Sequence, residues 1–352
     1  MNNTIELKWK HSNITTYVYE SYMLGIMEAN GNDYKEWMLS NYIQLNCHDD
    51  IYRDRDVFFA FYGDIGIYSP YLKVQKLSWS YVRMLGMDLI PLFKKSIELG
   101  CYLYFKLDEF YVPNRRTFGK SHYIHDNLIL GYDEECFIVL GYNCKGICEK
   151  NKIKYNQLIM ALESIMTDTN KEQWEDKMYI LQYQNADYHL NTDLIKESLY
   201  DYIHSINRKD KCKRFSNPLP DTVYGLATYD KVIEYLNYLL DGDDLFNEGA
   251  LIGGNAHIDN RIFRIIMEHK DLMLERIEFL SRKMDNLEDV FEEYKRIREI
   301  SEITHHLAVK YQLTADRKLL NKLIENVEFI KKRDGELLQK LYDRLCFFSY
   351  NF

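Results

Sequence analysis

Apolar residues recur at three- and four-residue steps through the second half of the chain. Two such series are Ile262, Ile266, His269, Met273, Ile277 and Leu280, and Leu319, Leu320, Leu323, Val327 and Ile330. This spacing gives each segment one apolar stripe, which predicts helices that pack against one another from about Tyr229 onwards. The second half is therefore expected to be a helical bundle.

The first half of the chain alternates between two kinds of pattern. Broad apolar stripes predict helices over residues 12–27 and 88–99, and Gly31 and Gly100 are suitable residues to end them. Short apolar and aromatic runs predict buried strands, at residues 101–105, 127–130, 136–140 and 178–183. The polar stretch between the second and third runs predicts a hairpin. Helices and strands mixed in one half indicate an α+β domain.

These patterns divide the chain into three expected parts. Residues 1–190 form the α+β domain, residues 191–220 a connection, and residues 221–352 the helical domain. Pro218 and Pro220 mark the connection, and they follow five cationic side chains within the segment 208–214. Such a cationic run is usually a solvated loop, and its functional alternative is a docking site for an acidic partner.

Composition excludes several classes of protein. The 352 residues include 54 Asp and Glu against 45 Lys and Arg, so the formal net charge is -9 and a nucleic acid is not expected as the main partner. No run of about 18 uncharged apolar residues occurs, and residues 1–8 lack a secretory pattern, so neither a membrane span nor secretion is expected. The seven cysteines are accordingly expected to be free thiols in a cytoplasmic protein.

Ser12 stands at the expected start of the first helix. A side chain there meets free backbone N–H groups and the positive end of the helix dipole, which stabilise developing negative charge. Thiol enzymes place a nucleophilic cysteine at such a position, because its pKa falls there. Ser12 is therefore a candidate nucleophile, and the simpler interpretation is that it only caps the helix.

His125 is the candidate general base, because it lies directly before an apolar strand that leads into the hairpin. A turn centred on Glu134 pairs residues whose numbers sum to 268, which places Asn143 opposite His125 with Cβ atoms about 5 Å apart. An amide there could orient the imidazole, as the third member of a nucleophile–base–orienter set. Asp133 lies about 25 Å away along an extended strand and is expected to be a turn residue. Alternatively, His125 is an ordinary half-buried histidine.

The cysteines offer weaker candidates. Cys136, Cys144 and Cys148 lack the four closely spaced ligands of a structural zinc site, so no metal is expected there. Cys47 is a rival nucleophile, although no helix start is predicted for its segment.

Several segments taken together carry a family resemblance. They are Gly100-Cys101-Tyr102-Leu103-Tyr104-Phe105, Asp108-Glu109-Phe110-Tyr111-Val112-Pro113, and His122-Tyr123-Ile124-His125-Asp126-Asn127-Leu128-Ile129-Leu130-Gly131-Tyr132-Asp133. This set resembles the N-terminal domain of the butirosin-biosynthesis-protein-H family, and the segments 224–230 and 268–273 are similar to that family's C-terminal region. Those N-terminal domains look like papain-type cysteine proteases redirected to acyl transfer. The resemblance therefore implies a papain-like fold for residues 1–190.

The resemblance also implies roles for individual residues. It places the nucleophile at position 12, the general base at His125 and the orienting residue at Asn143. The family has Cys where this chain has Ser12, so either the chain is a Cys-to-Ser form, or the protein naturally uses Ser or is inactive. Glu6 stands at the spacing of an oxyanion-hole residue, but a carboxylate would repel the oxyanion, so backbone N–H groups near Ser12 are expected instead.

The activity implied by the resemblance is acyl transfer in secondary-metabolite (nonribosomal peptide-like antibiotic) biosynthesis. This class includes papain-like enzymes that form amides in polythioamide pathways, and the Lys-, Ile- and Asn-rich composition of the chain would suit such an enzyme. The nucleophile would take an acyl group from the phosphopantetheine arm of an acyl or peptidyl carrier protein and pass it to a small amine, with no cofactor of its own. Two alternatives stay open: a thioesterase or peptidase with the same residues, and a catalytically dead binding or assembly protein.

Overall fold

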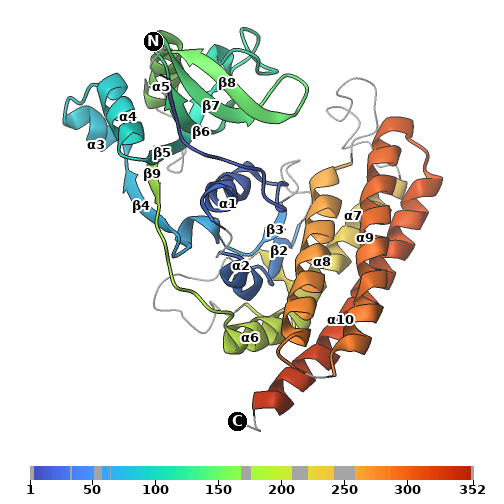
Figure 1. Ribbon diagram of the computed structural model, residues 1–352. Coiled ribbons are helices and arrows are strands. Elements are labelled where there is room, and N and C mark those ends of the chain that lie inside the picture. The colour runs from blue at the N-terminus through green and yellow to red at the C-terminus, as the bar shows by residue number, and fades with distance from the viewer. Residues whose placement is uncertain are drawn as a thin grey trace. The chain divides into compact units, whose positions relative to one another are not determined.

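The computed structural model describes residues 4–31, 34–50, 58–63, 65–167, 176–207, 221–241, 258–284 and 286–349 (Figure 1). The chain forms two compact units, and each is built from two separate stretches of sequence. The first unit comprises Met1–Tyr34 and Asp64–Tyr188, and the second comprises Lys35–Gly63 and His189–Phe352. The sequence assigned residues 35–63 to the first domain, whereas their contacts place them in the second unit. The expected connection holds helix α6, Thr192–Ile203, and its part at 208–220 lies outside the described residues.

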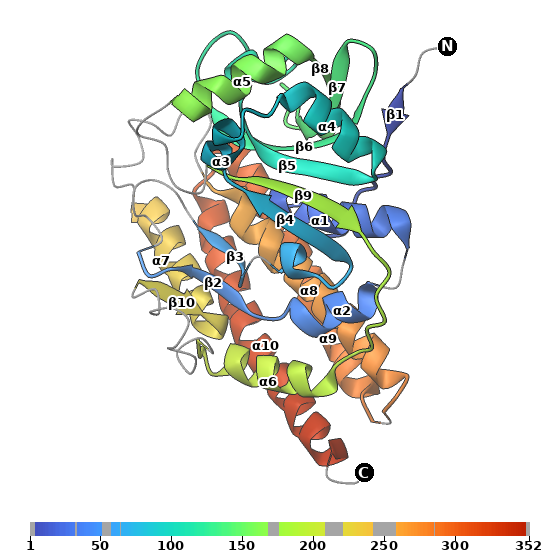
Figure 2. The ribbon, with the colours of Figure 1, turned by 90° about the vertical axis from the view of Figure 1, so that its left-hand side faces the viewer.

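The first unit is built on one antiparallel sheet with the strand order β4-β9-β5-β6-β7-β8, and β1 pairs with β6 (Figure 2). Its strands are β1 Ile5–Glu6, β4 Leu72–Leu77, β5 Cys101–Asp108, β6 Ile124–Tyr132, β7 Cys136–Tyr142, β8 Cys148–Lys154 and β9 Met178–Tyr183. The four expected strands and the hairpin are confirmed. The pairing sum of 268 holds at Leu128–Leu140 and Ile129–Val139, and the register then shifts by one residue towards the turn.

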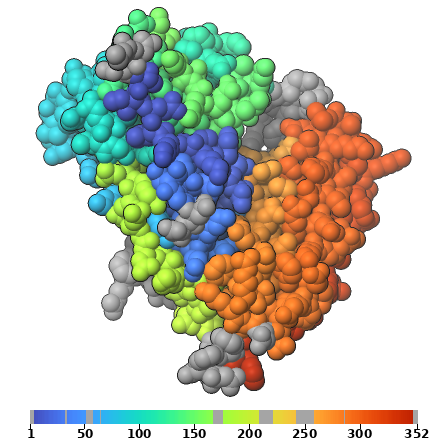
Figure 3. All heavy atoms as spheres, in the orientation of Figure 1, coloured from blue at the N-terminus to red at the C-terminus, as the bar shows by residue number. Residues whose placement is uncertain are grey.

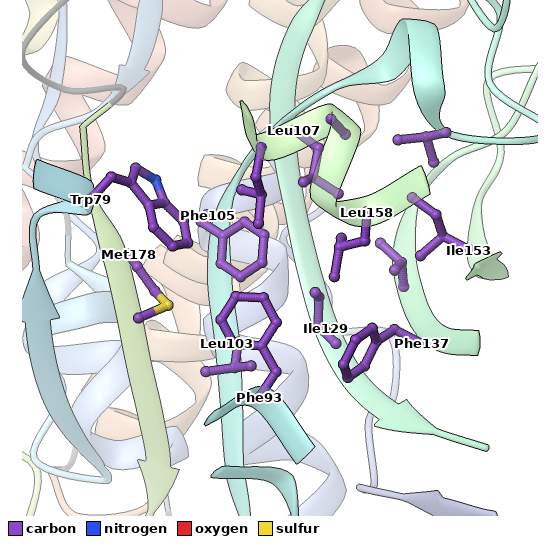
Figure 4. Close-up of a cluster of buried hydrophobic side chains, with 14 of the residues drawn as sticks. Trp79, Phe93, Leu103, Phe105, Leu107, Ile129, Phe137, Ile153, Leu158 and Met178 are labelled. Carbon is purple, nitrogen blue, oxygen red and sulfur yellow. The ribbon is translucent and has the colours of Figure 1, made fainter. Parts of the chain in front are cut away.

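Helices cover both faces of this sheet. Successive side chains of a strand point to opposite faces, so each strand contributes to both helix–sheet contacts. Phe105 and Ile129 point to one face, where they join the buried apolar cluster of Figure 4. The helices that contribute to this cluster are α3 Trp79–Met84, α4 Leu89–Glu98 and α5 Tyr155–Thr167. Tyr104 points to the other face, where its ring meets Tyr22 of helix α1 at 6.2 Å between centroids. The sheet and its two helical layers thus confirm an α+β unit.

Helix α1 spans Val18–Asn30 and begins six residues later than expected. The expectation of a helix from residue 12 is wrong, because the segment before α1 runs alongside the helix instead of continuing it. Lys10 N donates a hydrogen bond of 3.2 Å to the carbonyl oxygen of Gly25. Gly25 permits this approach, since a Cβ there would lie 2.1 Å from Nε1 of Trp9. Gly25, which lowers the helix propensity of this segment, is thus needed for α1 to pack against the segment that precedes it.

The second unit combines a small sheet with long helices. Strand β2, Leu45–His48, pairs with β3, Phe59–Phe61, and with β10, Thr222–Tyr224, which explains why residues 35–63 belong to this unit. Its helices are α2 Lys35–Asn41, α6, α7 Thr228–Asp241, α8 Asn260–Ser281, α9 Glu288–Thr314 and α10 Lys318–Ser349. Short 3-10 turns complete the described elements: η2 Gly66–Tyr68 and η3 Glu109–Tyr111 in the first unit, and η5 Gly225–Ala227 in the second.

The predicted helical region is confirmed, and the predicted stripe along α8 is buried from Ile262 to Leu280. Space-filling atoms close the gaps that the ribbon leaves within each unit (Figure 3). None of the helices in the described ranges is long and apolar enough to cross a membrane.

A charged pair is buried inside the helical unit. Nζ of Lys270, on α8, lies 2.6 Å from Oδ2 of Asp334, on α10, and both side chains are fully buried. The hydroxyl of Tyr202 donates to the same carboxylate at 2.7 Å, and Tyr294 donates to its other oxygen. Burial lowers the pKa of Lys270, although Asp334 opposes that shift. This carboxylate therefore joins α6, α8, α9 and α10 through one set of hydrogen bonds.

Candidate functional site

Ser12 lies in the segment before α1 and not at the helix terminus. Its side chain is buried, and its Oγ donates a hydrogen bond of 2.7 Å to the carbonyl oxygen of Ile14. The N-cap position belongs to Tyr17, which makes no side-chain capping bond. The expectation that the α1 dipole acts directly on Ser12 is therefore wrong, because that effect is confined to the first turn of a helix.

His125 lies at the second position of β6 and faces a buried carboxylate. Its Nδ1 lies 3.4 Å from Oε1 of Glu109, and its side chain is 22% exposed against 8% for Glu109. Tyr123 stacks on the imidazole, with ring centroids 5.5 Å apart and an angle of 21° between the planes. The arrangement gives His125 a carboxylate on one ring nitrogen and partial access to solvent.

Glu109 is fixed at the point where β5 passes into η3. Its backbone N–H donates to the carbonyl oxygen of Tyr123 at 2.8 Å. Oε1 of its carboxylate lies 3.7 Å from Nε of Arg115, whose side chain is fully buried. Glu109 Oε1, Arg115 Nε and His125 Nδ1 are all buried atoms with no hydrogen bond of normal geometry. Arg115 Nε and His125 Nδ1 thus both lie at ion-pair distance from Glu109 Oε1, without a hydrogen bond of normal geometry.

Arg115 connects Glu109 to the main chain around His125. Its Nη2 donates to Oδ1 of Asn127 at 2.9 Å, and Nδ2 of Asn127 donates to the carbonyl oxygen of His125, also at 2.9 Å. The guanidinium lies directly over Gly141, where a Cβ would come within 2.3 Å of Nη2. Only glycine leaves room for the arginine in this position.

Asn143, the expected orienting residue, uses its amide within its own hairpin. Its Oδ1 accepts backbone hydrogen bonds from Lys145 at 2.8 Å and from Ile147 at 3.0 Å, and its Nδ2 donates to Glu149 at 2.7 Å. The structure therefore does not bring the Asn143 amide to His125, although the register on which that pairing was based holds nearby at Leu128–Leu140.

The structure also does not bring Ser12 and His125 together. His125 pairs with Leu107 of β5, and Leu107 belongs to the apolar cluster on the face that α4 and α5 cover. Ser12 belongs to the segment before α1, and its hydroxyl donates to the carbonyl oxygen of Ile14 in that same segment. No hydrogen bond or ion pair joins the two side chains in the described part of the chain.

A second carboxylate–imidazole pair adjoins the first. Nδ1 of His122 lies 2.6 Å from Oδ2 of Asp108, which also accepts a hydrogen bond of 2.6 Å from Ser164. Burial by itself raises the pKa of the Asp108 carboxyl, but the hydrogen bonds from Ser164 and His122 bring it below its usual value. His122 stacks on Phe110 and is largely exposed. Consecutive acidic residues, Asp108 and Glu109, thus each hold a histidine.

The alternative nucleophiles are poorly suited to that role. Burial raises the pKa of the Cys47 thiol to about 12 and that of Cys148 to about 11, so neither forms a thiolate readily at neutral pH. Asp133 accepts backbone hydrogen bonds from Glu135 and Cys136, which confirms its predicted turn role. Within the described ranges no group of three or more His, Cys, Asp or Glu side chains could hold a metal.

No family model matches the chain, and no curated protein matches it either. The cationic segment 208–214 lies outside the described residues. Sequence reasoning missed Glu109, Arg115 and Asn127 as members of the site. The one signal for Glu109 was its position in the acidic–aromatic–Pro segment directly after a predicted strand.

Proposed function

We propose that the first unit is the catalytic part of a papain-like acyltransferase in which His125 is the general base. The observation that carries the proposal is the buried carboxylate of Glu109 beside Nδ1 of His125, because this arrangement leaves Nε2 as the basic nitrogen. An antiparallel sheet with α1 against one face is compatible with a papain-like fold. The segments around Asp108–Pro113 and His122–Asp133 add the family resemblance.

The proposed reaction has two stages. His125 Nε2 first takes the proton of the thiol at position 12 in the active form, and the resulting thiolate attacks the carbonyl carbon of an acyl thioester. The tetrahedral intermediate then expels the phosphopantetheine thiol of the carrier protein, which takes that proton. A small amine then attacks the acyl carbon of the acyl-enzyme while His125 removes the amine proton, and the C–S bond breaks to release the amide and regenerate the thiolate at position 12.

This reaction requires a change in the position of Ser12. Its Oγ donates to the carbonyl oxygen of Ile14 in the structure, so this hydrogen bond has to break before position 12 attacks the acyl group. The same observation favours a second candidate function, a binding or assembly protein that has lost its nucleophile. A hydrolase with the same residues is the third possibility, and the acceptor separates it from a transferase.

The test uses the Ser12→Cys protein, incubated with an acyl-pantetheine or acyl-carrier thioester and analysed by intact mass. A transferase gives an acyl adduct that disappears when amine is added, with formation of the amide. The Ser12 chain is the matched control for the seven natural cysteines, since an adduct on any of those cysteines is nonspecific. A His306→Ala variant, which changes an exposed histidine in the helical unit, is the control for His125→Ala.

The outcomes separate the three functions. An adduct that depends on His125 and is released to amines supports the acyltransferase. Release as free acid at the same rate with and without amine identifies a hydrolase. If Ser12→Cys and the Ser12 chain behave alike with every thioester tested, the catalytic proposal is wrong and the binding function is favoured.

A further inference from the structure

We propose that Glu109, held by Arg115, is the residue that positions His125, in the role that was predicted for Asn143. Its carboxylate accepts the Nδ1–H of the neutral imidazole and so keeps the Nε2 lone pair free to take a proton. The catalytic consequence rests on the function proposed above, whereas the effect on the imidazole itself does not.

The first support is the absence of a competing partner among the neighbouring polar groups. Asp108 is occupied by His122 and Ser164, and Asp126 accepts the hydroxyl of Tyr104 at 2.8 Å. The amide of Asn143 is committed to its own hairpin. Of the acidic and amide groups around β6 in the described ranges, Glu109 is the one that faces His125 Nδ1.

The second support is that the two facing atoms are buried and lack hydrogen bonds. Glu109 Oε1 and His125 Nδ1 are both buried and lack hydrogen bonds of normal geometry, although they lie only 3.4 Å apart. A buried acceptor and a buried donor without partners are each costly, and a small rotation of either side chain would satisfy both. Catalytic hydrogen bonds are often long in the unliganded state and shorten when the substrate binds.

The third support is the buried arginine. A carboxylate that is 8% exposed needs a compensating charge, and Nε of Arg115 supplies it at 3.7 Å. Through Asn127, the same arginine fixes the carbonyl group of His125 itself. Arg115 thus holds both members of the pair, and Gly141 leaves the space in which it does so.

A neutral imidazole carries its proton on only one ring nitrogen, so the partner of Nδ1 decides which nitrogen is basic. With Glu109 as acceptor, the Nδ1–H tautomer is favoured and Nε2 faces the reacting group. Without the carboxylate, the Nε2–H tautomer becomes accessible, and that tautomer cannot accept the proton of a nucleophile at Nε2.

The test reads the tautomer of His125 directly by 15N NMR of the histidine-labelled full chain at about pH 8, where ordinary histidines are neutral. A His125→Ala spectrum assigns the signals among the ten histidines. The Ser12 chain is expected to show His125 as Nδ1–H, and Glu109→Ala is expected to shift it to Nε2–H. Asp108→Ala is the matched control, which should change His122 and leave His125 as it is.

A kinetic measurement covers the case in which Glu109→Ala disturbs the fold. Glu109→Gln keeps the size of the side chain and removes its charge, so acyl-adduct formation on the Ser12→Cys chain should slow by about 10²–10⁴-fold. Asn143→Ala is expected to change that rate far less. If Ser12→Cys forms no adduct at all, the proposed function fails, and the tautomer alone decides the role of Glu109.

Two results would overturn the inference. One is a His125 that is already Nε2–H in the Ser12 chain, or that stays Nδ1–H in a folded Glu109→Ala variant. The other is a Glu109→Gln substitution that leaves the rate of the Ser12→Cys chain unchanged while Asn143→Ala slows it, since that pattern would return the positioning role to Asn143.

Discussion

Replacement of Asp334 by Asn should be among the most destabilising single changes in the helical unit. The substitution removes the negative charge that lies 2.6 Å from Nζ of Lys270 and leaves the ammonium fully buried. Nζ would then face only neutral groups among the described residues, which include the Asn amide oxygen, the hydroxyl of Tyr202 at 3.2 Å and Nδ1 of His269 at 3.0 Å. Removal of one partner of a buried ion pair costs about 3–5 kcal/mol, because the remaining charge stays desolvated.

The assay is urea unfolding of the full chain at pH 7, followed by far-UV circular dichroism. A loss of that size should lower the unfolding midpoint by about 1–2 M urea. The matched control is Asp230→Asn, which breaks a surface pair with Lys331 and should cost about 0–1 kcal/mol. Lys270→Met combined with Asp334→Leu should recover much of the loss, since no unpaired charge then remains. If Asp334→Asn and Asp230→Asn unfold at the same urea concentration, the charge of Asp334 does not stabilise the helical unit as proposed.

Three further measurements test other parts of the structure. Gly141→Ala should destabilise the first unit by about 1–3 kcal/mol in thermal or urea unfolding, because its Cβ would meet the Arg115 guanidinium at 2.3 Å; an unchanged midpoint would contradict that packing. Burial lowers the pKa of His305 to about 4, so as the pH falls the unfolded chain binds a proton at this histidine before the folded chain does. The free energy of unfolding should therefore fall as the pH drops from about 6.5 towards 4. His305→Gln should weaken this pH dependence, and an identical pH profile in that variant would refute the reasoning. Burial raises the pKa of Cys47 to about 12, so maleimide at pH 7 should label the exposed Cys144 and leave Cys47 unmodified until the chain unfolds.

The elements that could be predicted from sequence are those encoded by local patterns. The stripe of α8 and the runs of β5, β7 and β9 each depend on periodicity within one segment, and the structure contains all of them. The start of α1 could not be read in this way. It depends on Trp9 and Lys10 lying against Gly25, a contact between a flanking segment and the middle of the helix.

The candidate site also depends on contacts between segments, which local sequence patterns do not encode. The pairing sum that placed Asn143 opposite His125 is correct at Leu128–Leu140, but the Asn143 amide turns into its own hairpin a few residues further on. The contact between Glu109 and His125 depends on the register of β5 against β6, which pairs Leu107 with His125. No spacing in the sequence fixes that register, so the residue beside the histidine becomes visible only in the folded chain.

The two carboxylate–imidazole pairs give the first unit two different histidines. His122 is exposed and accompanied by Asp108, whereas His125 is largely buried and accompanied by Glu109 and Arg115. A general base in an acyl-transfer site needs shelter from water as well as a fixed ring orientation. His125 is therefore the better candidate of the two, and His122→Ala is expected to leave most of the acyl-transfer activity.

The most direct test of the proposed acyl transfer is the rate at which Ser12→Cys protein becomes acylated by a carrier-bound thioester, with and without His125→Ala. We expect a single acyl adduct on residue 12 that forms about 10²–10⁴-fold more slowly without the imidazole and is discharged to an amine. An adduct that forms equally fast in Ser12→Cys with His125→Ala, or no adduct beyond that of the Ser12 chain, would contradict it.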